Sequence, residues 1–302
     1  MHAAPTMSHC PLCNASDTVF AMDVRDVAVS GEVFQLADCK RCGLRFTHHP
    51  PCETSIVRYY QSDEYISHQQ HAKDVVSKLY MLARKFTLQQ KRRLIERFSA
   101  TSKGSLLDIG AGTGAFLHTM QSAGWDVTGL EPAETARNAA HQQFHLSLHP
   151  SAHLFELPDT RFDIITMWHV LEHVHDLHGY LSKIRCLLKP QGKLFIAVPN
   201  VESEDALHYG ASWAAYDVPR HLYHFSPNSI RSLMERNALK VTGILPMWLD
   251  AFYIALKSEE YRKGSRLSAL VEGCRSNLHA LFGKKYTSSL IYVVEAAEET
   301  KD

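Results

Sequence analysis

The sequence predicts an α/β protein with a doubly wound, mostly parallel sheet of seven strands, preceded by a small four-cysteine ribbon. From about residue 105 onward, strand-like apolar runs alternate with helix-like segments, which is typical of a parallel sheet with helices on both faces. A glycine-rich turn at 110–114 follows the first of these runs and precedes a helix-like segment. Two pairs of closely spaced cysteines lie near the N-terminus, before this alternating region.

The first element is a ribbon over residues 1–52 that we expect to bind zinc. An asparagine or a glycine, residues that adopt a left-handed backbone readily, follows each of its two C-x2-C pairs. Four thiolates at this spacing suit a tetrahedral zinc ion, whose binding helps to fold a segment too small for its own core. The expected ligands are Cys10, Cys13, Cys39 and Cys42. Disulfides are the alternative, which a reducing cytoplasm disfavours.

A helical segment is expected over residues 53–100. Apolar residues recur at helical spacing from about 73 to 98 and predict one long helix. The tyrosines before it, Tyr59, Tyr60 and Tyr65, either reach a bound ligand or pack the helix onto the sheet, and both alternatives stay open. The basic cluster at 91–93 is short, and we interpret it as a solvated face.

The main domain is expected over residues 101–302. Its predicted strands are 105–109, 125–130, 144–148, 162–168, 193–198, 239–245 and 289–295, of which the third is the least clearly marked. A helix at 180–188 is expected to end in a turn at 189–192, and Ser226 with Pro227 is expected to begin a helix at 227–238. A helical insertion at about 249–288 is expected to lie over the mouth of the substrate site.

The glycine turn indicates which ligand binds at the carboxyl edge of the sheet. Gly110, Gly112 and Ala115 satisfy the loose dinucleotide pattern G-x-G-x-x-G/A, so a nicotinamide cofactor is one alternative. Asp108, however, ends the strand before the turn, where it repels a pyrophosphate and attracts a cation. Glu131 ends the next strand, where it can accept hydrogen bonds from ribose hydroxyls. S-adenosylmethionine has a ribose and a positive charge but no phosphate, and it fits both carboxylates.

Four successive motifs resemble those of class I S-adenosylmethionine-dependent methyltransferases. LLDIGAGTGAFL, GLEP, FDIITMWHVLEHVHD and LLKPQGKLFIAVPN occur in the order and at the spacing of that family, over about residues 105–200. The cysteine-bearing N-terminus and WAAYDVPRHLYHF (213–225) are similar to a bacterial subgroup with an N-terminal zinc ribbon. The resemblance implies the Rossmann-like methyltransferase fold, a final antiparallel hairpin, and a cofactor covered by the helix that precedes the first motif.

The cofactor and the catalytic base are expected after the first, second and fourth strands. The expected cofactor-binding residues are Asp108, Gly110, Ala111, Gly112, Gly114, Glu131, Pro132, Trp168 and His169. Methyl transfer to an oxygen needs a proton acceptor, and His169 is the first candidate because the ordinary pKa of imidazole lies near working pH. Alternatively, His169 is a polar residue that merely lines the pocket. His173 is expected to form a hydrogen bond at a helix start.

A polar and aromatic cluster after the fifth strand supplies the expected acceptor site. Aromatic rings can stack on an acceptor ring, a guanidinium can pair with a carboxylate or phosphate, and His221 is a second candidate for the base. The expected acceptor-binding residues are Trp213, Tyr216, Arg220 and His224. The same cluster could instead be a structural network that anchors its loop.

The leading hypothesis is a methyltransferase acting on an oxygen or nitrogen of a small molecule or glycan precursor. An RNA methyltransferase whose ribbon holds the nucleic acid and a non-catalytic S-adenosylmethionine-binding scaffold are the alternatives. Nucleic acid is disfavoured because Lys and Arg total 32, as do Asp and Glu, and no N/D-P-P-Y/F signature is present. No carboxylate–histidine set at metal-ligand spacing is evident near the fourth strand, which disfavours magnesium-dependent chemistry.

The sequence also indicates the cellular compartment in which we expect the protein. It has no apolar run of membrane-spanning length and no secretory signal pattern at its start. We therefore expect a cytoplasmic protein with no membrane partner. The oligomeric state is left open.

Overall fold

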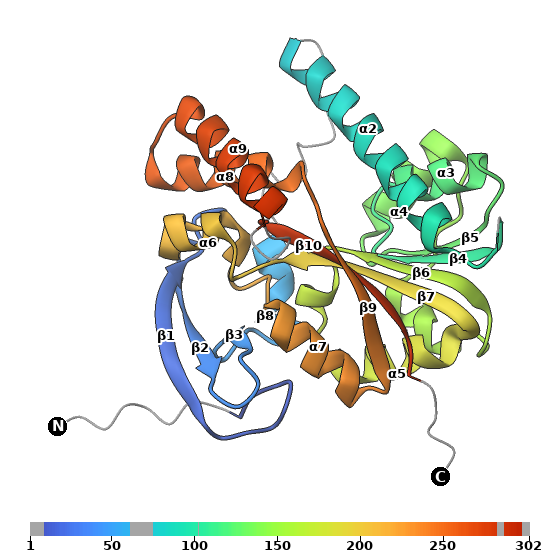
Figure 1. Ribbon diagram of the computed structural model, residues 1–302, viewed down its shortest axis with the longest axis horizontal. Coiled ribbons are helices and arrows are strands. Elements are labelled where there is room, and N and C mark those ends of the chain that lie inside the picture. The colour runs from blue at the N-terminus through green and yellow to red at the C-terminus, as the bar shows by residue number, and fades with distance from the viewer. Residues whose placement is uncertain (1–8, 61–74, 102, 283–286, 298–302) are drawn as a thin grey trace.

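The computed structural model describes residues 9–60, 75–101, 103–282 and 287–297 (Figure 1). Within them, the central sheet has six strands in the order β5-β4-β6-β7-β10-β9. These are β4 (Ser105–Ile109), β5 (Asp126–Leu130), β6 (Phe162–Trp168), β7 (Leu188–Pro199), β9 (Leu239–Pro246) and β10 (Ser289–Ala296). The β4–β5, β4–β6 and β6–β7 pairs are parallel, whereas β10 is antiparallel to both β7 and β9. The mostly parallel sheet with a final antiparallel hairpin is confirmed.

The strand expected at 144–148 is reduced to a single bridge. His149 pairs in parallel with Leu130 at the end of β5. His145 has a left-handed backbone directly after a helix, and Pro150 begins the next one, so few residues remain to extend along the sheet edge. The described part of the sheet therefore has six strands where seven were predicted.

Helices cover both faces of the sheet. One face carries α2 (Val75–Phe98), α3 (Ala115–Ser122) and α4 (Glu134–Phe144), and the other carries α5 (Leu177–Leu187) and α7 (Pro227–Arg236) (Figure 1). Alternate residues of each strand enter the two cores: Leu106 and Ile164 pack toward α2 and α3, and Leu107 and Ile165 pack toward α5 and α7. This alternation confirms the doubly wound arrangement.

The remaining helices are short or belong to the expected insertion. The short ones are η1 (Ile56–Tyr60), η2 (Ser151–Glu156), η3 (Leu171–His173), α6 (Glu204–Tyr209), η4 (Gly210–Ser212) and η5 (Ala214–Tyr216). The insertion contains α8 (Asp250–Arg262) and α9 (Arg266–Phe282), which pack against each other. Tyr65, and the side chains of α2 up to residue 83, lie outside what the structure describes. Among the described helices, none is both long and apolar enough to cross a membrane.

The turn predicted at 189–192 lies inside β7 rather than before it. The first residues of β6 and β7 pair, but the next ladder pair joins Ile164 to Lys193, so residues 189–192 loop out opposite Asp163. Pro190 has no N–H to give to the ladder, which accounts for the interruption. The expected break is therefore an irregularity within the strand.

The ribbon carries a second sheet, which the main domain completes. Its strands are β1 (Thr18–Arg25), β2 (Val33–Cys39) and β3 (Arg45–Thr47), and β3 pairs with β8 (Tyr223–His224) from far along the chain. Leu12 and Leu44 of the ribbon are buried in the same core as α5 and α7. Figure 1 shows the ribbon below α6, on the α7 side of the central sheet. The ribbon and the main domain thus share packing and hydrogen bonds.

Candidate active site

The glycine turn between β4 and α3 forms one wall of a large cavity. Gly110, Gly112 and Gly114 have φ angles of +74°, +54° and +77°, a region that disfavours side chains. A Cβ at Gly110 would lie 2.4 Å from Cγ2 of Val170, whereas one at Gly112 would meet nothing within 4 Å. The first glycine therefore lets the loop after β6 pack closely, and the second leaves room for a ligand.

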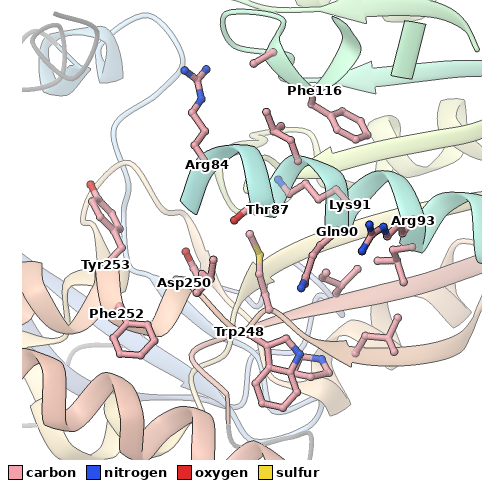
Figure 2. A pocket seen from close by; sticks show the side chains of 18 of the residues that line it. Arg84, Thr87, Gln90, Lys91, Arg93, Phe116, Trp248, Asp250, Phe252 and Tyr253 are labelled. Carbon is pink, nitrogen blue, oxygen red and sulfur yellow. The ribbon is translucent and has the colours of Figure 1, made fainter. Parts of the chain in front are cut away.

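The cavity has a volume of about 1170 Å³ and lies between α2 and the start of α8 (Figure 2). Arg84 and Lys91 line it from α2, Phe116 from α3, and Asp250 and Tyr253 from α8. Sites for one drug-sized ligand typically measure ~300–1,000 Å³. This cavity therefore has room for a cofactor and part of an acceptor together.

Asp108 is buried beneath the glycine turn and faces cationic charge. Its carboxylate accepts a hydrogen bond from the hydroxyl of Thr166 at 2.6 Å. Burial raises the pKa of Asp108 to about 7, although Thr166 and Lys91 both oppose that rise. Burial likewise lowers the pKa of Lys91 to about 8. A desolvated carboxylate that already attracts one cation fits the positive charge of S-adenosylmethionine.

Lys91 is a site residue that sequence reasoning missed. Its ammonium lies 4.2 Å from the ring centroid of Trp168 and lines the cavity, so it does not belong to a solvated face as expected for 91–93. Trp168, an expected cofactor-binding residue, also packs edge-on against Phe116 with centroids 5.6 Å apart. The helical spacing that predicted α2 could have placed Lys91 on its inward face.

Glu131 ties the end of β5 to the glycine turn. Its Oε2 accepts a hydrogen bond from the backbone N–H of Gly112 at 2.8 Å, and its Oε1 accepts one from Ala133 at 3.0 Å. A carboxylate offers about four acceptor positions, so ribose hydroxyls can still bind. Ala111 lines the cavity, whereas the carbonyl oxygen of Pro132 accepts a hydrogen bond from a side chain of α4.

His169 lies directly after β6, between two carboxylates. Its Nδ1 is 3.3 Å from Oε1 of Glu172, and its Nε2 is 3.6 Å from Oδ2 of Asp250. Burial lowers the pKa of His169, but the two carboxylates outweigh burial and the net pKa is raised. Among the described residues, Nε2 has no hydrogen-bond partner. The ring is therefore held at Nδ1, and its buried Nε2 faces Asp250, a residue that lines the cavity although His169 itself does not.

Asp250 is a second residue that sequence reasoning missed. It opens α8, in a segment predicted only as a helical cover. An acidic residue at the first turn of a helix is common for electrostatic reasons alone, so no local pattern indicates that this carboxylate faces His169.

A second polar cluster lies behind His169. One nitrogen each of His173 and His221 and one oxygen of Glu172 lie within 4.8 Å of one another. Glu172 is fully buried, and its Oε2 has no hydrogen-bond partner among the described residues. The expectation that no carboxylate–histidine set lies near the end of the fourth strand was wrong. The sequence does not predict this set because His221 lies on a loop far along the chain from Glu172 and His173.

The expected acceptor-binding residues lie apart from the cavity. All four are buried, and none lines it: Trp213, Tyr216, Arg220 and His224. Trp213 donates to Asp205 at 2.8 Å, and Tyr216 accepts from Arg45 of the ribbon at 2.9 Å. These contacts match the alternative interpretation, a network that anchors the loop.

Arg220 is the centre of this network. Its Nη2 lies 3.1 Å from Asp26 of the ribbon and 2.5 Å from Asp217, and its Nη1 donates to the carbonyl oxygen of Tyr59 at 2.9 Å. Its side chain is 2% exposed, and that of Asp26 is fully buried. The neighbouring His221 directs Nδ1 at the carbonyl oxygen of Ala215, 2.8 Å away.

The four ribbon cysteines have the arrangement of a metal site. Their Sγ atoms all lie within 4.8 Å of one another: Cys10, Cys13, Cys39 and Cys42. Two of the Sγ–Sγ separations are 3.5 Å and 3.6 Å, close to the ~3.8 Å between thiolates around a tetrahedral zinc ion. Asn14 and Gly43 have φ angles of 56° and 72°, so the expected left-handed turns are present. The ribbon could therefore hold zinc.

Comparison with known proteins agrees with this geometry. The model of a methyltransferase domain family matches residues 83–243. A ubiquinone biosynthesis O-methyltransferase of Coxiella burnetii is 30% identical over 161 residues, covering 48% of this chain and 68% of that protein. Its counterpart in Vibrio cholerae is 28% identical over 188 residues, covering 58% of this chain and 74% of that protein.

Two solved structures resemble the fold. The 1,6-didemethyltoxoflavin-N1-methyltransferase of Burkholderia thailandensis superposes with a TM-score of 0.50 at 14% identity, covering 84% of this chain and 96% of that one. Phosphoethanolamine N-methyltransferase 2 of Haemonchus contortus also has a TM-score of 0.50, at 20% identity, covering 70% of this chain and 53% of that one. At these identities the likeness concerns the fold alone.

Proposed function

The chain belongs to the methyltransferase domain family and is an S-adenosylmethionine-dependent methyltransferase, and we propose that it methylates an oxygen atom of a small molecule with His169 as general base. The observation that carries this proposal is the ring of His169, held between Glu172 and Asp250 beside the glycine turn. The O-methyltransferase names of the curated relatives support an oxygen acceptor of small size over the RNA alternative.

The residues around the glycine turn suit S-adenosylmethionine. When bound, this cofactor supplies a methyl group activated by a positively charged sulfur. Asp108 provides a buried carboxylate whose charged form a cationic ligand would stabilise, and Glu131 provides acceptors for ribose hydroxyls. Gly112 leaves space in the cavity wall that a side chain would fill. Lys91 lines the cavity from α2, and its ammonium lies over the ring of Trp168.

His169 is proposed to take the proton of the acceptor hydroxyl. Glu172 accepts only, so its contact with Nδ1 favours the tautomer in which Nδ1 carries the proton and Nε2 carries the lone pair. The acceptor O–H bond then breaks toward Nε2, and the resulting imidazolium is stabilised by Glu172 and Asp250. The proton leaves to solvent after the methyl group has been transferred.

The first experiment separates cofactor binding from proton transfer. Calorimetric titration with S-adenosylmethionine, with NADH as control, tests the cofactor. A labelled-methyl screen of phenolic and other hydroxylated small molecules tests turnover. We expect His169→Ala to keep cofactor affinity within about twofold and to lose roughly 10²–10⁴-fold in turnover.

A matched control uses another histidine that pairs with a glutamate three residues later. His153 lies 2.7 Å from Glu156 and does not line the cavity. His153→Ala is expected to keep full turnover. Full turnover by His169→Ala, or methylation of RNA but of no small molecule, would overturn the proposal.

We also propose that the ribbon binds a structural zinc ion through Cys10, Cys13, Cys39 and Cys42. The proximity of the four sulfur atoms and the two left-handed turns support this role. The division into a ribbon (1–52), a helical cap (53–100) and a methyltransferase domain (101–302) likewise remains a proposal.

A further inference from the structure

We propose that the acceptor carries an anionic group, a phosphate or a carboxylate, on an aromatic or apolar body, and that Arg93 and Arg97 bind the anion at the mouth of the cavity. This inference rests on the proposed function, because it describes the molecule that shares the cavity with the cofactor. The binding experiment below distinguishes a phosphate from a carboxylate.

One wall of the cavity is strongly basic. Among its lining residues, α2 contributes four cationic side chains, Arg84, Lys91, Arg93 and Arg97, whereas the described lining includes one carboxylate, Asp250. The chain as a whole has equal numbers of basic and acidic residues. The local excess of positive charge therefore belongs to this cavity rather than to the whole protein, and it raises the local concentration of anions.

The four cations differ in what they already contact. Lys91 faces the charges of Asp108 and Asp250, and Arg84 donates to the hydroxyl of Thr113 in the glycine turn at 3.3 Å. These two side chains therefore belong to the cofactor end of the cavity.

Arg93 and Arg97 are both exposed and can reach another ligand, although the guanidinium of Arg97 also lies 5.7 Å from the ring centroid of Phe98. They lie one helical turn apart, and among the ion pairs of the described residues neither has a carboxylate partner. Arg92, between them in sequence, lies 3.5 Å from Glu96 and does not line the cavity. Two neighbouring guanidinium groups match the geometry of phosphate and carboxylate oxygens. Arg97 lies six residues beyond Lys91, ~9 Å further along the helix axis, so its anion site is separate from the cofactor end.

The opposite wall is aromatic. Trp248, Phe252 and Tyr253 line the cavity from the turn after β9 and the first turn of α8 (Figure 2). Trp248 is 36% exposed and Tyr253 is 51% exposed. Large apolar surface around a cavity is typical of a ligand site, and aromatic rings there stack on flat or apolar bodies. An acceptor that carries an anionic group on an aromatic or apolar body therefore contacts both the basic wall and the aromatic wall.

The test uses 1-naphthyl phosphate, 1-naphthoate and 1-naphthol as probes. Their binding is measured by calorimetry on the full chain saturated with S-adenosylhomocysteine. We expect at least one of the two anionic probes to bind about tenfold more tightly than the neutral naphthol, and to weaken as salt is raised. Which anion binds more tightly distinguishes a phosphate from a carboxylate acceptor.

Three variants localise the effect. The double variant Arg93→Gln/Arg97→Gln should lose about tenfold in affinity for the anionic probe and keep its cofactor affinity. Arg92→Gln on the same helix is the matched control and should change neither. Trp248→Ala should weaken the anionic and neutral probes alike, because it removes contact with the shared ring.

The outcomes separate this inference from the proposed function. Equal binding of neutral and anionic probes, or an unchanged anion affinity in the double variant, overturns the anion site. In that case, retained binding of S-adenosylmethionine leaves the proposed function standing. Absence of cofactor binding in the unaltered chain overturns the proposed function itself.

Discussion

His169 combines an unusual backbone conformation with an unusual charge environment. Its φ angle is +57°, a region that few residues other than glycine adopt, and it turns the chain sharply at the end of β6. The turn places its ring between Glu172 and Asp250, whose charges raise its pKa against the effect of burial. A raised pKa makes the imidazole a stronger base, but it also keeps more of it protonated at neutral pH.

This charge environment predicts the pH dependence of turnover. The base acts when neutral, so turnover should rise with pH and level off above a midpoint that lies above the ordinary histidine value of ~6.5. Asp250→Asn removes one of the charges that raise the pKa of His169, so the midpoint should move to lower pH. Asp159→Asn, which alters a surface pair with Lys183, is the control. A midpoint that stays in place in Asp250→Asn would show that another group is the base.

The close packing at Gly110 leads to a second prediction, which concerns the stability and the cofactor affinity of the variant Gly110→Ala. Gly110→Ala places a methyl group 2.4 Å from Val170 and also imposes a strained left-handed backbone. Gly31 has a similar φ of +70°, but a methyl group there meets nothing within 4 Å. Gly31→Ala should therefore cost about 1–2 kcal/mol of unfolding free energy and leave cofactor affinity unchanged. Gly110→Ala should cost more and weaken S-adenosylmethionine binding at least tenfold, as measured by denaturant unfolding and calorimetry. Identical behaviour of the two variants would argue against the close approach at Gly110.

At this scale the sequence predicts residues whose position follows from local pattern. The glycine turn, Asp108 and Glu131 each follow a recognisable strand, and parallel strands end at the same edge. Lys91 and Asp250 reach the cavity because α2 and α8 pack over that edge. No local pattern in the sequence predicts that packing. Their charge alone predicts a solvated position, and only the tertiary structure shows that both line the cavity.

At the scale of elements, the loop that contains Arg220 links three parts of the chain. Arg220 contacts the ribbon at Asp26, its own loop at Asp217, and the backbone of η1 at Tyr59. A buried cation with this many partners mainly fixes the relative position of elements. Removing one member of a buried pair leaves the other charged and unpaired.

Arg220→Met is therefore expected to destabilise the fold. Because Asp26 would remain buried without its partner, the loss in unfolding free energy should be about 3–5 kcal/mol. Arg58→Met is the control, since Arg58 pairs with Glu32 at 3.4 Å in an exposed position, where such pairs contribute little. Thermal unfolding of both variants measures the difference. Unchanged stability with a raised KM for the acceptor would instead restore Arg220 to the acceptor site predicted from the sequence.

The elements that the sequence predicts well are those with a strong local signal. The apolar runs that became β4 and β6 have the predicted bounds, because a buried strand needs an uninterrupted apolar stretch. The two residues of β8 carry no such signal, and they form a strand only because β3 lies beside them. The irregularity in β7 likewise depends on its partner strand, whereas Pro190 and Gly192 by themselves predicted a turn.

At the scale of the whole molecule, the ribbon is part of the main fold rather than an appendage. Its cysteines lie in one continuous core with α5 and α7, and its sheet takes its fourth strand from the main domain. Zinc binding and folding are coupled wherever a metal holds residues that the unfolded chain does not bring together. Because β8 begins two residues after His221, the proposed zinc ion in the ribbon would also stabilise the loop behind His169.

Zinc removal should therefore loosen a defined part of the main domain. We expect about one zinc ion per chain, and its removal by a chelator should lower the thermal unfolding temperature. Hydrogen exchange should then accelerate in β1, β2, β3 and β8 together, while β4 and β6 keep their protection, because among the described strands β8 pairs only with β3 of the ribbon. Cys39→Ser should reproduce the effect, whereas Cys52→Ser, at an exposed cysteine outside the four, should not. If chelation exposed the ribbon strands and left β8 protected, the ribbon would be an independent unit, and zinc would have no part in holding the loop behind the proposed base.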